Sequence, residues 1–252
     1  MSQNVGPRRL SDTRQLYWKG CVYGLPGVGK TIFASTSQKH RTFVIDIDDG
    51  VNSADAFLTS NKLSKDLCTI YTITSTQEFT GAMNYLSANM DKFDIVVIDS
   101  ATELQRLIIQ EVCNMSKHQT PDQRDWGIIR SLMENIILNF RHMSKHFVMV
   151  CHEINKLDPD MNRDVYRPSF DGRTAFEYAK HLSWIARYVI SMKSEKQPSG
   201  ETTQTIMRAL DFGPTPYAHY KDRSGMMQRY EYPNLDAILE KMANSTTTSE
   251  EV

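Results

Sequence analysis

The sequence has 252 residues, of which 40% are hydrophobic and 23% are charged, and its formal net charge is −1. This composition predicts a globular protein, and it excludes a strongly basic chain that would attract nucleic acid through its net charge. No apolar run reaches the roughly 18 residues of a membrane helix, and the polar N-terminus lacks the apolar core of a signal peptide. We therefore expect a cytoplasmic protein that contacts no membrane.

Apolar strands alternate with amphipathic helices over the first 150 residues. Short apolar runs predict buried strands, and apolar residues that recur every three or four positions predict helices. This alternation favours an α/β fold in which a mostly parallel, twisted sheet has helices on both faces. The predicted strands are 16–23, 43–47, 69–72, 94–99 and 147–151, and the predicted helices include 30–33, 79–90, 104–112 and 129–140.

The pattern changes after residue 151. Polar residues, Pro and Gly dominate the next segment, which we interpret as a loop, and two later strand-like runs flank a turn-rich stretch that predicts a C-terminal β-hairpin. We expect a flexible segment at 1–14, a single domain at 15–243 and a disordered tail at 244–252. In the last hundred residues we predict a loop at 155–173, a helix at 174–182, strands at 184–192 and 204–212, and a closing helix at 235–242.

The segment GLPGVGKT fits the pattern G-x-x-x-x-G-K-[ST] through Gly24, Gly29, Lys30 and Thr31. Glycines let backbone N–H groups cradle phosphate oxygens, the lysine reaches the β- and γ-phosphates, and the hydroxyl binds Mg²⁺. The motif follows a predicted strand and precedes a predicted helix, as this phosphate-binding loop requires. The remaining residues predicted to contact the nucleotide are Pro26, Gly27, Val28 and Ile32.

A carboxylate ends the predicted strand at 95–98. Asp99 stands where a second Mg²⁺ contact belongs in phosphate-loop enzymes, and the alternative is that it caps the helix that follows. Many such enzymes place a catalytic glutamate directly after this aspartate, but here the next residue is Ser100. The base that orients or deprotonates the attacking water must therefore come from elsewhere.

Asp48 is our choice for that base. It follows the predicted strand at 43–47, which we expect to lie beside the strand of the phosphate-binding loop. Glu103 and the neighbouring Asp46 and Asp49 are the alternatives, as is a merely solvated acidic turn. His152 follows the predicted strand at 147–151, where a polar side chain can sense the γ-phosphate; its alternative is a structural histidine.

These pieces together resemble the RecA-like ATPases, and most closely the short phage-encoded single-strand annealing ATPases of the Sak recombinase group. The resemblance rests on 23–31 (YGLPGVGKT), 44–50 (VIDIDDG), 93–104 (FDIVVIDSATEL), 147–153 (FVMVCHE) and 221–225 (KDRSG), with the tripeptide DWG at 125–127. It covers about residues 15 to 240. It implies a RecA-like core, ATP and Mg²⁺ as cofactors, and the cytoplasm of a bacterial host if the chain is phage-encoded.

The resemblance also implies residue roles. Asp48 aligns with the family's catalytic carboxylate, although the family usually has Glu there, and His152 aligns with its sensor. Lys221 and Arg223 are similar to a K-N-R-F-G element of the RadA/Sms proteins, in which they would reach the γ-phosphate of a neighbouring subunit; the alternative is an exposed basic turn. The loop at 155–173 would bind DNA through Lys156, Arg163, Tyr166, Arg167 and Arg173, although its four basic and four acidic residues balance.

Two functions follow as expectations. The first is an ATP-dependent recombination protein that assembles on single-stranded DNA as a ring or filament, promotes annealing or strand pairing, and has a single-strand binding protein as a further partner. The second is a nucleotide-gated switch or assembly ATPase, KaiC-like or helicase-loader-like, that acts on a protein. The neutral predicted loop favours the second mildly.

Overall fold

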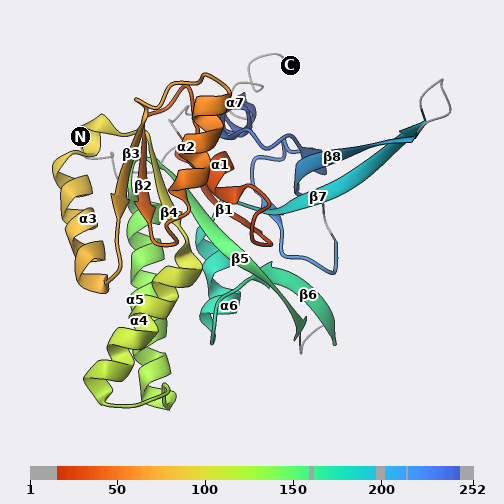
Figure 1. Ribbon diagram of the computed structural model, residues 1–252. Helices are drawn as coiled ribbons and strands as arrows, with labels where there is room; N and C mark the ends of the chain where they lie inside the picture. Colours follow the sequence, from red (N-terminus) through yellow and green to blue (C-terminus); the bar gives the residue numbers. More distant parts are fainter. Residues whose placement is uncertain (1–15, 159–161, 197–201, 214, 245–252) are drawn as a thin grey trace, which may run out of the picture.

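The computed structural model describes residues 16–158, 162–196, 202–213 and 215–244. A mostly parallel sheet forms its centre, as Figure 1 shows, with an antiparallel hairpin at one edge. The predicted α/β class is therefore confirmed. In spatial order the strands are β10 (Tyr230–Glu231), β8 (Thr202–Asp211), β7 (Trp184–Lys196), β1 (Lys19–Gly24), β5 (His146–Asp158), β4 (Ile95–Asp99), β2 (Thr42–Asp46) and β3 (Cys68–Thr72).

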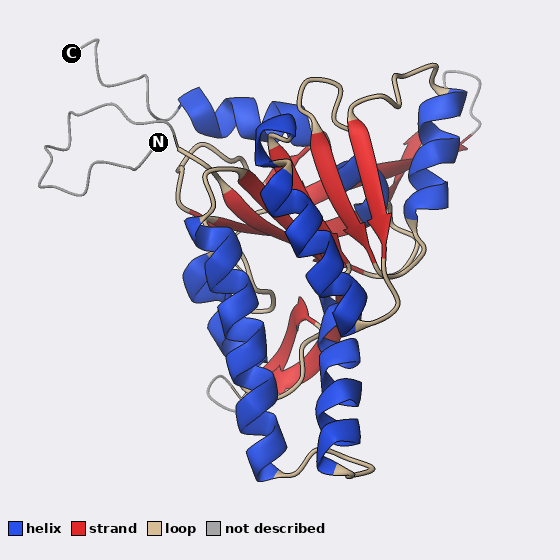
Figure 2. Cartoon of the chain, turned by 90° about the vertical axis from the view of Figure 1, so that its left-hand side faces the viewer, coloured by secondary structure: helices blue, strands red, loops and turns tan. Residues whose placement is uncertain are grey.

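Helices cover both faces of this sheet (Figure 2), because β1, β2 and β4 consist wholly of buried residues and have apolar side chains on each side. Two apolar clusters result, one on each face. The first face carries α3 (Thr76–Ala88), α4 (Ala101–Ser116), α5 (Gln123–His142), α6 (Thr174–Glu177) and the short 3-10 turns Met90–Lys92 and Tyr178–His181. The second carries α1 (Lys30–Ser35), α2 (Val51–Ser60) and α7 (Leu235–Asn244).

The strand order corrects one expectation. We predicted that the strand ending near Ile47 lies beside the strand of the phosphate-binding loop, but β5 and β4 stand between β2 and β1. Each of these strands is a short apolar run, so their sequences carry no information about which one pairs with which. Asp48, which follows β2, is therefore separated from the strand of the phosphate-binding loop by the carboxyl ends of β4 and β5.

The predicted loop at 155–173 is also wrong for most of its length. β5 does not end at Cys151 but continues to Asp158, and it pairs antiparallel with β6 (Arg163–Pro168). The resulting two-stranded ribbon, residues 153–158 and 163–168, projects from the sheet (Figure 1). Its polar sequence looked like a loop because backbone hydrogen bonds, and not apolar burial, hold most of it.

The C-terminal expectations are confirmed where the structure describes them. β7 and β8 form the predicted hairpin, with ten residue pairs from Arg187↔Asp211 to Lys196↔Thr202, and α7 closes the fold. The segment 1–14 and the tail from 245 lie outside the described residues, whereas Asn244 ends α7. Among the described helices, none combines the length and apolar character needed to cross a bilayer.

Candidate functional site

The phosphate-binding loop joins β1 to α1 at the carboxyl edge of the sheet. Gly27 and Gly29 have φ angles of 75° and 113°, which favour glycine and leave the backbone N–H groups free to turn inward. The Lys30 amine donates to the carbonyl oxygens of Gly24 and Leu25, at 2.9 and 2.8 Å. The loop thus holds its lysine in place through its own backbone. The other predicted contacts, Pro26, Val28, Thr31 and Ile32, lie in this loop and the first turn of α1.

Asp99 lies at the end of β4, and its side chain is almost completely buried. It hydrogen-bonds to Thr31, but its Oδ2 atom has no hydrogen-bond partner among the described residues. Burial raises the pKa of Asp99 to about 6, and burial also raises the pKa of Asp46, its register partner on β2, to about 6. The side chains of Thr31, Asp99 and Asp46 all offer oxygen atoms here, and Oδ2 of Asp99 has no other partner among the described residues. Such a set of oxygens fits a hard cation such as Mg²⁺.

The alternative role for Asp99, capping the next helix, is wrong. Ser100 caps α4, because its Oγ accepts a hydrogen bond from the Glu103 backbone N–H at 3.3 Å. The Asp99 carboxylate is consequently directed to the phosphate-binding loop. Burial lowers the pKa of Lys30, and the nearby carboxylates of Asp99 and Asp48 oppose that shift.

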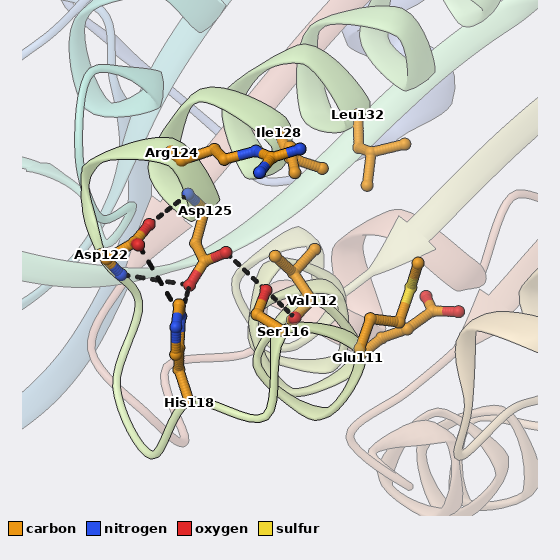
Figure 3. Close-up of a pocket in the computed structure, with 10 residues that line it drawn as sticks. Glu111, Val112, Ser116, His118, Asp122, Arg124, Asp125, Ile128 and Leu132 are labelled. Carbon is orange, nitrogen blue, oxygen red and sulfur yellow. Dashed lines mark hydrogen bonds and ion pairs between the residues drawn. The ribbon is translucent and has the colours of Figure 1, made fainter.

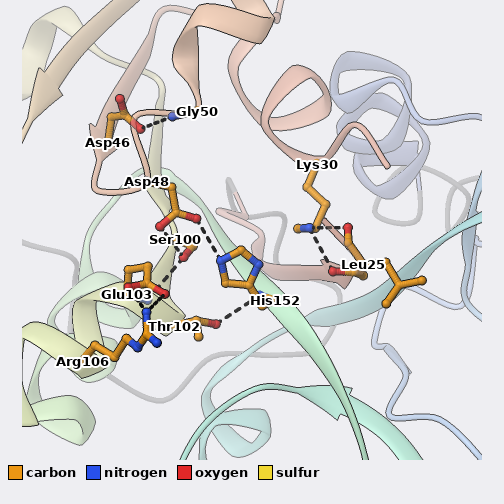
Figure 4. A network of polar contacts seen from close by, with 11 residues as sticks. Leu25, Lys30, Asp46, Asp48, Gly50, Ser100, Thr102, Glu103, Arg106 and His152 are labelled. Carbon is orange, nitrogen blue, oxygen red and sulfur yellow. Dashed lines mark hydrogen bonds and ion pairs between the residues drawn. The ribbon is translucent and has the colours of Figure 1, made fainter. Parts of the chain in front are cut away.

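Asp48 and His152, predicted separately as base and sensor, contact each other (Figure 4). Nε2 of His152 lies 3.0 Å from Oδ2 of Asp48, and the Ser100 hydroxyl donates to Oδ1 of Asp48 at 3.1 Å. The backbone N–H of His152 donates to the Thr102 hydroxyl at 3.1 Å, which fixes β5 against α4. The carboxylate therefore has both oxygens engaged and a defined orientation, as a group that positions a water must have.

Glu103, one of the alternative bases, belongs to the same cluster. Its carboxylate, the Asp48 carboxylate and the His152 ring offer ligand atoms that all lie within 4.8 Å of one another. However, both Glu103 oxygens accept from the Arg106 guanidinium at 2.9 Å. Glu103 is thus paired with a cation of its own helix, whereas Asp48 contacts His152, the register partner of Gly24, which favours Asp48 as the base.

Sequence reasoning missed the supporting residues Ser100, Thr102 and Gln105. Ser100 was interpreted only as the absence of a glutamate, yet its hydroxyl donates a hydrogen bond to the Asp48 carboxylate. Gln105 is buried and exchanges two hydrogen bonds with the backbone of Asp171, at 2.8 and 3.1 Å, and so ties α4 to the segment after the ribbon. A polar residue at a core position of a helix was the signal for Gln105; the other two had none.

The predicted DNA-binding residues do not form one group. By register, Lys156, Arg163 and Arg167 occupy one face of the ribbon, because they pair across it with Val165, Asp158 and Ile154. Tyr166 occupies the other face, where the Arg187 guanidinium covers its ring at 3.7 Å from the centroid. Arg173 lies beyond β6, in a cavity of about 390 Å³ that Trp126 also lines.

Lys221 and Arg223 lie at the edge of the sheet opposite the phosphate-binding loop of their own chain. Lys221 belongs to the two-residue strand β9 (Lys221–Asp222), which pairs with the first residues of β7, and these lie beside the start of β1, whereas the loop follows the end of β1. Its amine donates to the Ala179 carbonyl at 2.6 Å, and burial lowers the pKa of Lys221 to about 8, with Arg223 and Arg141 adding to the shift. Arg223 is exposed.

The turn between α4 and α5 holds a second polar cluster, shown in Figure 3. Asp125 accepts from the Ser116 hydroxyl at 2.5 Å and from the Asp122 backbone N–H at 3.1 Å, and it pairs with His118 at 2.6 Å. These contacts, with the His118 pair first, lower the pKa of Asp125 to about 2. All of them close the helical turn, so we assign the cluster a structural role.

Comparisons with known proteins identify a family for this chain. No curated protein sequence matches the chain. Among solved structures it is similar to a prototypical ATPase from the type III secretion system of pathogenic bacteria, with 14% identity and a TM-score of 0.42, over 75% of this chain and 65% of that one. A family model described as "AAA domain" matches residues 16–224, which include the phosphate-binding loop, Asp99 and the Asp48–His152 pair. The chain therefore belongs to the AAA domain family of P-loop ATPase-like proteins.

Proposed function

We propose that this protein is an ATP-dependent DNA recombination protein of the Sak recombinase kind, which binds single-stranded DNA as an oligomer and promotes annealing or strand pairing. One observation carries the proposal. β5 presents His152 to the phosphate site and then continues without a break into the ribbon face that carries the half-buried Arg163 and Arg167 and, four residues after His152, the exposed Lys156. One strand thus connects the ATP site to a surface suited to a polyanion.

The residues of the site divide the work of hydrolysis. Lys30 binds the β- and γ-phosphates, and Thr31 and Asp99 would hold Mg²⁺. When bound, the metal would supply positive charge that offsets the charge developing on the transferred phosphoryl group. Asp48 orients the attacking water and takes its proton, while Ser100 keeps the carboxylate in place. His152 contacts the Asp48 carboxylate through Nε2, so a change in what Asp48 binds would change the position of the His152 ring.

Both strands of the ribbon are anchored beside His152. β5 leads directly from it, and the Ser169 backbone N–H, just after β6, donates to the His152 carbonyl at 2.9 Å. Glu153 pairs with Arg187 at 2.7 and 2.9 Å, and Arg187 covers Tyr166. A displacement of His152 on loss of the γ-phosphate would therefore move both ribbon strands, which supports coupling between hydrolysis and DNA release.

Self-association into a ring or filament would complete the site. Arg223 is exposed and lies at the sheet edge opposite its own phosphate-binding loop, so it is suited to neutralise charge at a neighbour's γ-phosphate. Lys221 would have to release the Ala179 carbonyl to do the same. A monomer would consequently hydrolyse ATP slowly. A single-strand binding protein that delivers coated DNA is a further partner in this proposal.

A second candidate is a nucleotide-gated switch or assembly ATPase, KaiC-like or helicase-loader-like, that acts on a protein. The covered ring of Tyr166 favours it, because that ring has one face less for stacking on a base. Leu157, 59% exposed on the ribbon, would suit an apolar partner surface.

Measurement of single-stranded DNA binding and ATP hydrolysis together tests the proposal. The double variant Lys156→Gln, Arg163→Gln should weaken binding of an oligonucleotide and reduce the slope of log Kd against log salt by about 1.4, at roughly 0.7 for each lost phosphate contact. The matched control Lys62→Gln, Lys92→Gln removes two exposed charges away from the ribbon, and it should change neither the oligonucleotide affinity nor the salt slope. Absence of oligonucleotide binding by the wild type with an ATP analogue would leave the switch ATPase as the function.

A further inference from the structure

The outer side of β8 is a strand edge with very little pairing. Figure 1 shows β7 and β8 running out together from the body of the fold. β8 pairs with β7 along one side, but on its other side it pairs only with β10, through Leu210 and Asp211. Residues 202–207 therefore present a row of backbone N–H and C=O groups that no other strand pairs with in the part of the chain that the structure describes. We call these six residues the free edge.

The free edge lacks the usual features that keep exposed strands from pairing. Charged residues, Pro and β-bulges commonly protect such edges. The sequence at 202–207 is TTQTIM, which contains neither a charged residue nor Pro. The ladder between β7 and β8 is also regular, because its ten residue pairs follow one another without a bulge. The free edge is therefore open to a further antiparallel strand.

Exposed apolar side chains lie beside the free edge. By register Met192 on β7 lies opposite Ile206 on β8, and Ile190 follows on the same face of the hairpin; these side chains are 66%, 53% and 43% exposed. Met207, on the other face, is 49% exposed. A group of large apolar side chains in the solvent is typical of a contact surface. A strand added at the free edge would extend the sheet and cover part of this group.

The free edge is complementary to a second copy of itself. Two antiparallel copies of one strand, related by a two-fold axis perpendicular to the sheet, offer each other the same hydrogen-bonding groups. With the axis at Ile206, this residue lies opposite its own copy, and the apolar groups of both hairpins share one face. Arg208 is the only charged residue of β8 before Asp211, and this register places it opposite Gln204 of the other copy. Like charges therefore do not meet across the axis.

We propose that the protein forms a symmetric dimer in which β8 pairs antiparallel with β8 of a second copy, centred on Ile206. This contact goes beyond the proposed function, because it requires neither nucleotide nor DNA. It also differs from the head-to-tail contact through Arg223, since both copies use the same surface. Where both contacts form, β8 pairing joins one ring or filament to another.

Disulfide crosslinking of Ile206→Cys, without nucleotide or DNA and with copper phenanthroline as oxidant, tests the position of the axis. Directly opposite residues of antiparallel strands have Cβ atoms about 4.5–5.5 Å apart, so the variant should crosslink readily. The matched control is Met192→Cys, an exposed residue on the same face but on β7. Its two copies would lie three strand spacings apart, about 14 Å, and should crosslink little. The wild type gives the background from its four cysteines, which are buried or half-buried.

Exchange of charge at Ile206 tests the same contact by sedimentation equilibrium. Ile206→Lys and Ile206→Glu should each weaken dimerisation about ten-fold or more, because like charges then lie opposite each other at the axis. An equimolar mixture of the two variants should restore dimers, which also shows that both are folded. Met192→Lys should dimerise within about three-fold of the wild type, since it places its charge on β7.

Two results would overturn the inference. The first is a wild type that sediments as a monomer at every concentration, and the second is Ile206→Cys that crosslinks no faster than Met192→Cys. Failure of the mixed Lys and Glu variants to restore dimers would have the same meaning. None of these results bears on the proposed function, because nucleotide and DNA are absent from the measurements.

Discussion

Replacement of Asp99 by Asn should make the nucleotide-free protein more stable and abolish its use of Mg²⁺. The carboxylate is buried with Oδ2 lacking a hydrogen-bond partner among the described residues, and burial raises its pKa from 3.8 to about 6. An ionised carboxylate in this position is therefore unfavourable at neutral pH. An amide of the same shape avoids that cost but is a poor ligand for the metal.

The magnitude and the pH dependence follow from the two pKa values. Between about pH 4 and 6 Asp99 holds a proton in the folded state that it has released in the unfolded state, so the contribution of Asp99 to the free energy of unfolding falls as the pH rises through this window. At 1.36 kcal/mol for each pH unit, the difference between 3.8 and about 6 corresponds to about 3 kcal/mol. Asp99→Asn should therefore match the wild type near pH 4 and exceed its stability by up to about 3 kcal/mol at pH 7.

Urea unfolding without Mg²⁺ and nucleotide, repeated from pH 4 to 7.5, measures this difference. Asp91→Asn is the control, because Asp91 is exposed and its replacement should leave the curve parallel to that of the wild type. The reasoning is refuted if Asp99→Asn is less stable than the wild type at pH 7, or if the difference between them is independent of pH.

Two further predictions concern the scaffold. His146 accepts a hydrogen bond from the Trp18 backbone N–H, and burial lowers the pKa of His146 from 6.5 to about 4. The contribution of His146 to stability should therefore fall by up to about 3 kcal/mol as the pH drops through this window, opposite in sign to the contribution of Asp99. In thermal unfolding, the stability of His146→Gln relative to the wild type should accordingly rise as the pH drops. Gly29→Ala forces a side chain into φ 113° and against the Tyr188 hydroxyl, so it should cost about 1–3 kcal/mol and weaken nucleotide binding, as calorimetry would show. Gly127→Ala, in open space within α5, should instead stabilise the protein by up to about 1 kcal/mol.

The features predicted well from sequence are local ones. The phosphate-binding loop is a contiguous segment of eight residues that joins a buried strand to a helix, as predicted. Within it the Lys30 amine donates to the Gly24 carbonyl, and Thr31 hydrogen-bonds to Asp99. The strands and helices of the core follow from apolar periodicity, because each is buried on a defined face. Asp99 could be located for the same reason, as the last residue of a buried strand.

The features that could not be predicted depend on pairing between distant segments. Each core strand is a similar apolar run, so its sequence does not show which other strand it pairs with. For this reason the sequence did not show that β5 and β4 separate β2 from β1, nor that Asp48 contacts His152. The ribbon was mistaken for a loop because Lys156 and its neighbours are exposed and polar. A cavity of about 390 Å³ beside the phosphate-binding loop was also unpredictable, because Arg208 on β8 and Tyr232 after β10 line it and both are distant from the loop in sequence.

Single-turnover ATP hydrolysis by Asp48→Asn tests the central claim most directly, namely that this P-loop site uses Asp48 to activate water. Because Asp48 is placed outside the phosphate contacts, the variant should bind Mg·ATP within a few-fold of the wild type. Loss of a general base should slow release of the γ-phosphate by about 10²- to 10⁴-fold. The neighbouring Asp49→Asn, at an exposed residue, should hydrolyse ATP at the wild-type rate. Hydrolysis by Asp48→Asn within about three-fold of the wild type would contradict the account.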